Sequence, residues 1–284
     1  MVKRIPVLII VSAVVFITAC IDSTTVITVK KDGSGTITET LFVNESVKMM
    51  MQGMMSEFAE EEEAETAGDL LDPEEYKEKA ANLGEGVTFV SAENITGEDG
   101  SEGIRVVYAF DDIRTLNYHA QPENPLGDQM AAGMGAEASE DEGDDPITFD
   151  FIEGGTSKLI VHMPEKDEPE TDHEMPEETM PDAEEAAGAM GMMRMFMQGF
   201  RLRVMIDPEG NIQGTNASFV EKIEGRENVV LLDVALGEIM NNEEYFEEWQ
   251  SMSQIQDMGA AMEKMSKIPG LKIETQENVE IIFR

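Results

Sequence analysis

The stretch TTVITVKKDGSGTITETLFV (Thr24–Val43) decides the fold class, because its pattern predicts a β-hairpin. Residues 24–30 alternate and are rich in β-branched side chains, Gly33 and Gly35 fall in a turn, and residues 36–43 resume the alternation. We therefore predict two antiparallel strands that meet at this glycine-containing turn.

Further along the chain, the same signal returns three times, as two apolar runs separated by a turn that contains glycine. The expected pairs are 86–95 with 103–110, 147–152 with 157–162, and 200–206 with 211–217. Two single strands are expected at 228–234 and 271–283. Repeated hairpins of this kind predict an antiparallel sheet.

Helical patterns lie between the hairpins. Apolar residues recur at steps of three and four in 44–63 and 242–267, residues 182–198 read as a further helix, and Asp72-Pro73 is typical of a helix start. Strands in hairpins with helices between them predict an α+β domain, in which the helices pack on one face of the sheet.

Three stretches are strongly acidic and poor in apolar residues: 56–75, 137–145 and 165–185. Chain segments of this composition cannot bury enough apolar surface to fold alone. We predict a single α+β domain over 20–284, with disordered acidic inserts near 120–145 and 165–182.

The beginning of the chain has the layout of an export signal. Lys3 and Arg4 precede an uncharged apolar run, Ile5–Ile17, which is too short to span a bilayer stably. We predict that residues 1–19 form a signal peptide that is removed.

The apolar run ends in Ile17, Thr18, Ala19 and Cys20, and this quartet resembles the lipobox of bacterial lipoproteins. The resemblance implies cleavage before Cys20 and acylation of its sulfur with chains such as palmitate. Cys20 is the single cysteine of the chain. The alternative is an ordinary cleaved signal followed by an unrelated cysteine.

Two or more acyl chains hold a protein firmly to a membrane without a transmembrane helix. The expected location is therefore the extracytoplasmic face of a membrane. Ile21, the residue after the expected anchor, does not resemble an inner-membrane retention signal, which favours the outer membrane.

Composition excludes several classes of function. The chain has 59 acidic against 20 basic residues and a formal net charge of −39, so nucleic acid is not expected as a partner. With Cys20 acylated no thiol remains, and His119, His162 and His173 show no paired spacing. We expect no metal centre and no cofactor.

Residues 32–38 match the middle of an EF-hand calcium loop, but the first ligand position falls on Lys30 and the last on Leu41. A cation and an apolar residue cannot supply calcium ligands. The turn of a hairpin is the favoured interpretation.

Of the 22 methionines, ten form two groups, within 49–55 and 190–197, and thioethers suit Cu(I). Methionine is also adaptable core filling and a plastic contact surface. Periplasmic copper binding is therefore one hypothesis, and a groove or surface for an apolar ligand or a protein partner is another. The candidate residues are Met50, Met51, Met54, Met55, Met192, Met193, Met195 and Met197.

No nucleophile motif, phosphate loop or dinucleotide fingerprint is present, so we do not expect an enzyme. A site built on Asp, Glu and Tyr would leave no local signature, and that alternative stays open.

Two further features are similar to LppM-type lipoproteins. Phe110-Asp111-Asp112-Ile113 ends a predicted strand, and a later predicted hairpin runs through Asp207, Gly210, Ile212 and Asn216. The resemblance implies an α+β domain that binds a lipid or glycolipid in an apolar cavity. The acidic inserts and methionine-rich helices depart from that pattern.

These features together predict a membrane-anchored lipoprotein with a non-enzymatic role in envelope binding or assembly. An apolar ligand would need a cavity, for which the candidate lining residues are Val87, Phe89, Val107 and Phe200. A protein-interaction module that uses the methionine-rich helices is the main alternative, and copper binding is the second.

Overall fold

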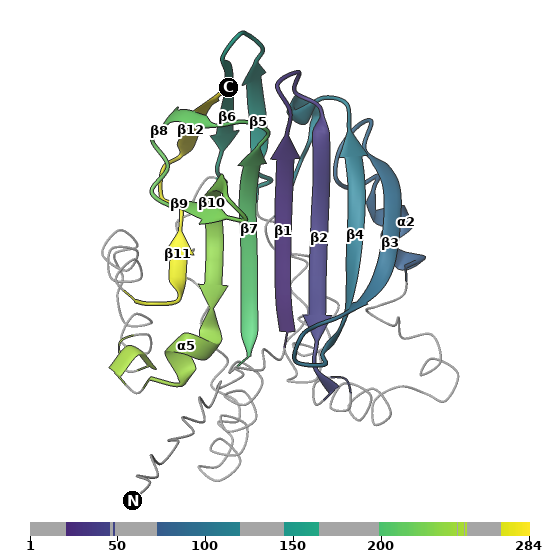
Figure 1. Ribbon diagram of the computed structural model, residues 1–284, viewed down its shortest axis with the longest axis vertical. Coiled ribbons are helices and arrows are strands. Elements are labelled where there is room, and N and C mark those ends of the chain that lie inside the picture. The colour runs from purple at the N-terminus through teal and green to yellow at the C-terminus, as the bar shows by residue number, and fades with distance from the viewer. Residues whose placement is uncertain are drawn as a thin grey trace, which may run out of the picture.

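The computed structural model describes residues 21–45, 48, 73–119, 145–164, 199–242, 244–246, 248 and 268–284. Within these residues the chain forms two β-sheets (Figure 1). The predicted inserts at 120–145 and 165–182 lie almost wholly outside the described residues, as do both methionine clusters and Cys20.

The large sheet has the strand order β11-β10-β7-β1-β2-β4-β3, and β9 pairs with β10 beside it. All neighbours are antiparallel except β1 and β7, which are parallel. Its strands are β1 (Ile21–Val29), β2 (Gly35–Val43), β3 (Thr88–Thr96), β4 (Glu102–Phe110), β7 (Phe200–Pro208), β9 (Val220–Ile223), β10 (Arg226–Ala235) and β11 (Leu271–Ile273).

The small sheet has the order β5-β6-β12-β8, with every pair antiparallel. Its strands are β5 (Thr148–Ile152), β6 (Ser157–His162), β8 (Ile212–Thr215) and β12 (Asn278–Phe283). The two sheets share one hydrophobic core. Ile27, Ile37 and Tyr108 of the large sheet and Leu159 and Phe283 of the small sheet are fully buried in the same cluster.

We call the side of the large sheet that carries Ile27, Ile37 and Tyr108 the core face, and the opposite side the outer face. Side chains alternate between the two faces along each strand. On β1, for example, Ile27 and Val29 are fully buried, whereas Val26 and Thr28 on the outer face are half-buried. The alternation read from residues 24–43 therefore sets the register of the central hairpin.

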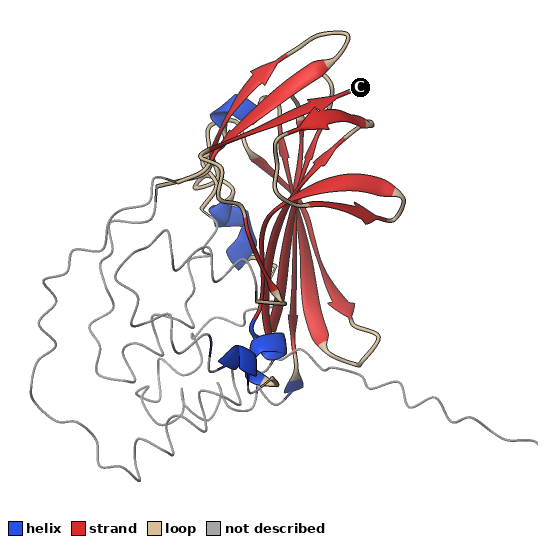
Figure 2. Ribbon diagram, turned by 90° about the vertical axis from the view of Figure 1, so that its left-hand side faces the viewer, coloured by secondary structure: helices blue, strands red, loops and turns tan. Residues whose placement is uncertain are grey.

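The predicted α+β class is wrong: the described residues are mostly strands, and no face of the sheet is covered by long helices there. The helices are α2 (Glu75–Lys79), the 3-10 turn η1 (Ile113–Thr115) and α5 (Leu236–Met240), which lie on one side of the large sheet (Figure 2). A second sheet provides the other layer. Its buried residues alternate with exposed or half-buried ones and pack in the shared core; they are Phe149, Leu159, Val161, Ile281 and Phe283.

Three of the four predicted hairpins are confirmed: β1 pairs with β2, β3 with β4, and β5 with β6. The fourth is wrong, because β7 belongs to the large sheet and β8 to the small one. After the turn at Gly210, Asn211 exchanges two backbone hydrogen bonds of 3.0 Å with Arg284. The chain thereby joins β12 instead of returning along β7.

The predicted closing strand at 271–283 is divided into β11 and β12, which lie in different sheets. Glu274, between them, is buried and fixes this crossing. Its carboxylate accepts hydrogen bonds from the backbone N–H groups of Ser218, Thr275 and Gln276 and from the Ser218 hydroxyl, at 2.6–3.0 Å. A buried carboxylate with four donors holds the loop before β9 against the end of β11.

Candidate functional site: the anchor end of the large sheet

Strand β1 begins at Ile21, the residue that follows the predicted lipidated cysteine. Ile21 lies between Val43 of β2 and Phe200 of β7, and its backbone N–H donates to the carbonyl oxygen of Gly199 at 3.1 Å. Only 8% of its surface is exposed. The first residue after Cys20 is therefore held on both sides inside the sheet.

We call this edge of the large sheet the anchor end. It comprises the start of β1 at Ile21, the end of β2 at Val43, the turn 97–101 between β3 and β4, the start of β7 at Phe200 and helix α5. Consecutive Cα atoms are about 3.8 Å apart, so a lipid on Cys20 would be attached one residue from the sheet. No linker of even a few residues would separate the two.

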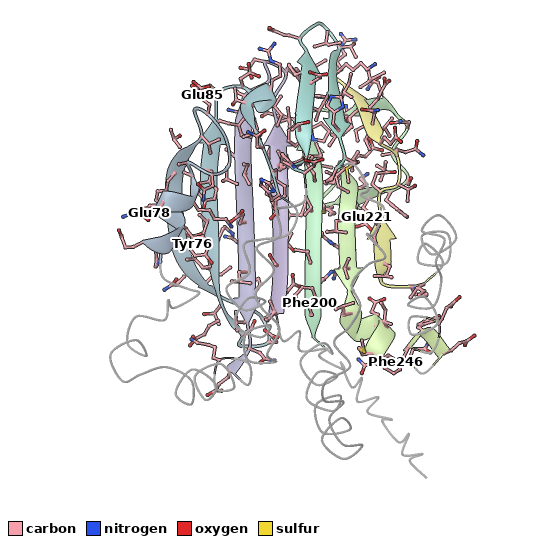
Figure 3. The ribbon with its side chains drawn as sticks, turned by 180° about the vertical axis from the view of Figure 1, so that it is seen from behind. Tyr76, Glu78, Glu85, Phe200, Glu221 and Phe246 are labelled. Carbon is pink, nitrogen blue, oxygen red and sulfur yellow. The ribbon has the colours of Figure 1, made fainter. Side chains whose placement is uncertain are left out.

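A second apolar cluster lies at the anchor end, apart from the main core. It is formed by the buried residues Leu236, Ile239, Ile268 and Leu271, and Phe200 packs against both this cluster and the main core. Figure 3 shows Phe200 at the lower end of β7, on the side where α5 and Phe246 lie. The anchor end is thus folded and has its own small hydrophobic cluster.

On the outer face, next to the anchor end, three cationic side chains surround one carboxylate. Arg201 Nε lies 3.0 Å from Asp233 Oδ1, and Arg203 Nη2 lies 2.7 Å from Asp233 Oδ2. Lys272 reaches the same carboxylate at 3.3 Å and Glu221 at 2.5 Å. The register places these residues in adjacent positions across β7, β10 and β11.

The cations of this network control the ionisation of its buried carboxylate. Burial alone would raise the pKa of Asp233, but the hydrogen bonds from Arg201 and Arg203 outweigh burial and hold that pKa below its usual value. The hydrogen bond to Glu221 raises the pKa of Lys272. The network therefore stays ionised and links strands β7, β10 and β11. Each carboxylate oxygen of Asp233 already contacts a cationic side chain.

The core face carries two buried tyrosines that bear on acid–base chemistry. The Tyr118 hydroxyl lies 2.8 Å from Thr25 Oγ1, and the Tyr108 hydroxyl donates to the Tyr76 carbonyl oxygen at 3.0 Å. Burial raises the pKa of both phenols well above the usual value. Both tyrosines therefore stay protonated at neutral pH and serve as hydrogen-bonded core residues.

The residues predicted to line an apolar cavity do not converge. Val87, Phe89 and Phe200 pack against the main core cluster, and the Phe89 ring lies edge-on to Tyr108 at 6.2 Å between centroids. Val107 pairs with Thr38 on the outer face. One recess among the described residues lies at the end of the sheet opposite the anchor, and charged residues line it: Lys30, Lys31, Asp32 and Glu209.

The calcium-loop match is a hairpin turn. The Asp32 carboxylate accepts hydrogen bonds from the Ser34 N–H at 3.1 Å and the Ser34 hydroxyl at 2.7 Å, and Gly33 has φ +85°. Across the described ranges, no three His, Cys, Asp or Glu side chains come together as metal ligands would. Of the histidines, His162 lies on β6 between Asn278 and Asp150, and His119 is exposed.

Other predicted site residues fall where nothing is described: the lipobox with Cys20, and all eight candidate methionines. No helix among the described residues is long and apolar enough to cross a membrane. Sequence reasoning missed the Asp233 network, because its members lie about 30 to 70 positions apart and only the strand register brings them together.

Comparison with known proteins adds one structural likeness. No family model matches the chain, and no curated protein matches it. The folded domain of Mycobacterium tuberculosis LppM, solved by NMR, aligns over 78% of this chain and 85% of that one, with 11% identity and a TM-score of 0.29. A likeness of this size carries no conclusion about function.

Proposed function

We propose that this chain is a lipoprotein of the cell envelope, anchored through Cys20, whose β-sheet domain sits directly on the membrane surface. In that position it binds or helps to assemble another envelope component and catalyses no reaction. The observation that supports this proposal is the start of β1 at Ile21, which leaves a lipid on Cys20 no linker to the folded domain.

An anchor without a linker restricts both the height and the orientation of the domain. The anchor end would face the lipid headgroups, and the turn at Lys31-Asp32 would point away from them. The strands of the central hairpin are nine residues long, which corresponds to about 30 Å. The domain is therefore suited to partners at a fixed distance from the membrane.

The strong negative charge of the chain supports the need for a covalent anchor. A net charge of −39 opposes adsorption to anionic lipid, so the folded domain alone should not stay at such a membrane. Two or three acyl chains on Cys20 would supply the missing affinity.

The test begins with the host cell, grown with an alkyne analogue of palmitate. The full-length protein should carry the label and sediment with membranes, whereas Cys20→Ser should carry no label and should leave the membrane fraction. A labelled Cys20→Ser protein, or an unlabelled wild type, would overturn the proposal.

Insertion of a linker tests the role of the short connection separately. A stretch of about ten Gly and Ser residues between Cys20 and Ile21 should keep the lipid label while releasing the domain from its fixed height. If envelope binding needs the fixed geometry, the binding partner recovered with the wild type should be lost from the linker variant.

Native mass spectrometry of the full-length protein, extracted gently from its own envelope, distinguishes the possible partners. An added mass in the range of a lipid would favour the apolar-ligand alternative. A mass shift equal to copper would favour the methionine clusters as a metal site, and a bare polypeptide with its anchor would leave a protein partner as the working proposal.

A further inference from the structure

Strand β3 is a free edge of the large sheet. It pairs with β4 on one side only, and at nine residues it is longer than β11, β5 or β8, the other edge strands in the sheet orders. Natural proteins normally protect such an edge with charges. In β3 only Glu93 is charged, although 28% of the residues in the whole chain are charged.

The hydrogen bonds of the β3–β4 hairpin show which backbone groups face outward. Gly97 N–H donates to the Ser101 carbonyl oxygen at 2.8 Å, so this pair is a hydrogen-bonded one. Pairs alternate along an antiparallel ladder. By the register, Ser91, Glu93 and Ile95 therefore bond to β4, whereas Ala92, Asn94 and Thr96 direct their N–H and C=O groups away from the sheet.

The outward groups are accessible. Asn94 and Thr96 are exposed, Ala92 is half-buried, and no partner for their backbone occurs among the described residues. A bulge between Phe89 and Ser91 leaves Val90 56% exposed at one end of the strand. From Ser91 to Thr96 the register is regular, so these six residues offer an uninterrupted edge for an added strand.

The charges around this edge are unbalanced. Within the described part, each nearby cation is already in an ion pair: Lys77 with Glu74, Lys79 with Glu39, and Arg105 with Glu93. Three neighbouring acids form no ion pair there: Glu78 on α2, Glu85 in the following loop and Glu98 in the β3–β4 turn. Figure 3 shows Glu78 and Glu85 along the side of the molecule where α2 flanks β3.

From these observations we propose that the free edge of β3 receives an extended, cationic segment of a partner protein as an added strand. Main-chain hydrogen bonds to Ala92, Asn94 and Thr96 would supply the pairing, and the unpaired acids would select Lys or Arg on the partner. A second copy of this chain is disfavoured, because each copy carries a charge of −39. The proposal is independent of the lipid anchor.

The probe is an eight-residue peptide of alternating Lys and Val with both ends blocked, added to the full-length protein in a zwitterionic detergent. We expect amide hydrogen exchange at Ala92, Asn94 and Thr96 to slow by roughly tenfold or more at saturation, while the amides of Ser91, Glu93 and Ile95 do not change. A Glu-Val peptide should bind at least about tenfold more weakly.

Two controls separate strand addition from simple charge attraction. The same Lys-Val peptide, with its strand-facing amides N-methylated, should lose binding although its charge is unchanged. Asn94→Pro removes an outward donor and should abolish binding, whereas Asn94→Ala should retain it. If Asn94→Pro shifts the urea midpoint, Ala92→Pro replaces it as the blocking variant.

Several results would overturn the proposal. These are unchanged exchange at the three outward amides with peptide bound, equal binding of the N-methylated peptide, or equal binding by the proline and alanine variants. A dimer in sedimentation analysis that Asn94→Pro abolishes would assign the edge to a second copy and would also overturn the cationic partner.

Discussion

Arg203 on β7 and Asp233 on β10 face each other directly across the two strands, with Arg203 Nη2 2.7 Å from Asp233 Oδ2. Asp233 is 3% exposed and also forms ion pairs with Arg201 and Lys272. In a chain with 20 cations and 59 acids, three cations are committed to one buried carboxylate. This carboxylate therefore links β10 to β7 and to β11 beside the anchor end.

Replacing Asp233 with Asn should be among the most destabilising changes on the outer face, because three cations would lose their counter-charge. Removing one partner of a buried ion pair costs roughly 3–5 kcal/mol. Arg201 and Lys272 remain partly solvated, so we expect the lower end of that range in urea unfolding. The matched control is Glu93→Gln, which breaks the exposed Arg105 pair on the same face and should cost about 1 kcal/mol or less.

The effect of Asp233 should depend on pH in a defined direction. Its pKa in the folded protein is held below the ordinary value of 3.8, so its contribution is fully present above pH 3.8 and is lost as pH falls through the folded pKa. The difference in unfolding free energy between wild type and Asp233→Asn should therefore shrink below about pH 4. A difference that grows with acid would contradict the ion-pair explanation.

Asp207 should show the opposite pH dependence. Its side chain is 1% exposed and neither carboxylate oxygen accepts an aligned hydrogen bond, although Arg226 Nη2 lies 2.7 Å away. Burial raises its pKa above 3.8, and Arg226 only partly opposes this. Its contribution to stability is therefore present below pH 3.8 and is lost as pH rises through the folded pKa.

Asp207→Asn should accordingly gain stability relative to wild type as pH is raised from 4 to 7, by up to roughly 1 kcal/mol, because no buried charge remains to be desolvated. Thermal unfolding across that pH range measures the effect. If the variant loses stability at pH 7, the ion pair with Arg226 outweighs the burial of the carboxylate.

Much of the sheet could be predicted from local sequence, because period-two alternation and glycine turns act between neighbours. The pairs β1–β2, β3–β4 and β5–β6 depend only on such signals. Non-local choices could not be predicted. No local sequence pattern indicates that residues 212–215 pair with the last strand instead of folding back on β7. Nor does any local pattern indicate that β1 lies parallel to β7.

The candidate site divides in the same way. The position of Cys20 after the apolar run could be read directly from the sequence, and the next residue, Ile21, is the first of β1. The Asp233 network and the free edge of β3 depend on which strands become neighbours, which residues far apart in sequence decide. The fold class was wrong for a related reason: helical periodicity in residues 44–63 and 242–267 says nothing of the second sheet that packs on the core.

Glu274 gives a test of the crossing between the two sheets. Glu274→Ala leaves three backbone N–H groups and one hydroxyl without their shared acceptor. An unsatisfied buried donor costs about 1–3 kcal/mol, but Ser218, Thr275 and Gln276 are exposed and water can reach them. We therefore expect a loss of about 1 kcal/mol, with faster hydrogen exchange at these three residues. Glu277→Ala, at an exposed position three residues on, is the matched control and should change neither quantity.

Gly35 tests the tight start of β2. A Cβ at this position would lie 1.9 Å from the Thr28 carbonyl oxygen and 2.5 Å from Phe110 Cζ. Gly35→Ala should therefore destabilise by about 3 kcal/mol, at the top of the range for overpacking. Gly100 has φ +87° but open space around it, so Gly100→Ala should cost only about 1–2 kcal/mol of backbone strain. Equal losses would show that space around Gly35 is not limiting.

The orientation on the membrane can be measured because lipidation would consume the single cysteine, so that an introduced cysteine becomes a unique labelling site. Glu98→Cys places a dye in the turn at the anchor end, and Lys31→Cys places it in the turn at the opposite end; both positions are exposed. The strands between them correspond to about 30 Å. With full-length protein in vesicles that carry a headgroup acceptor dye, energy transfer should be much stronger from residue 98 than from residue 31. Insertion of a flexible linker after Cys20 should reduce this difference, whereas equal transfer from both positions in the unmodified protein would show that the anchor does not hold the sheet upright.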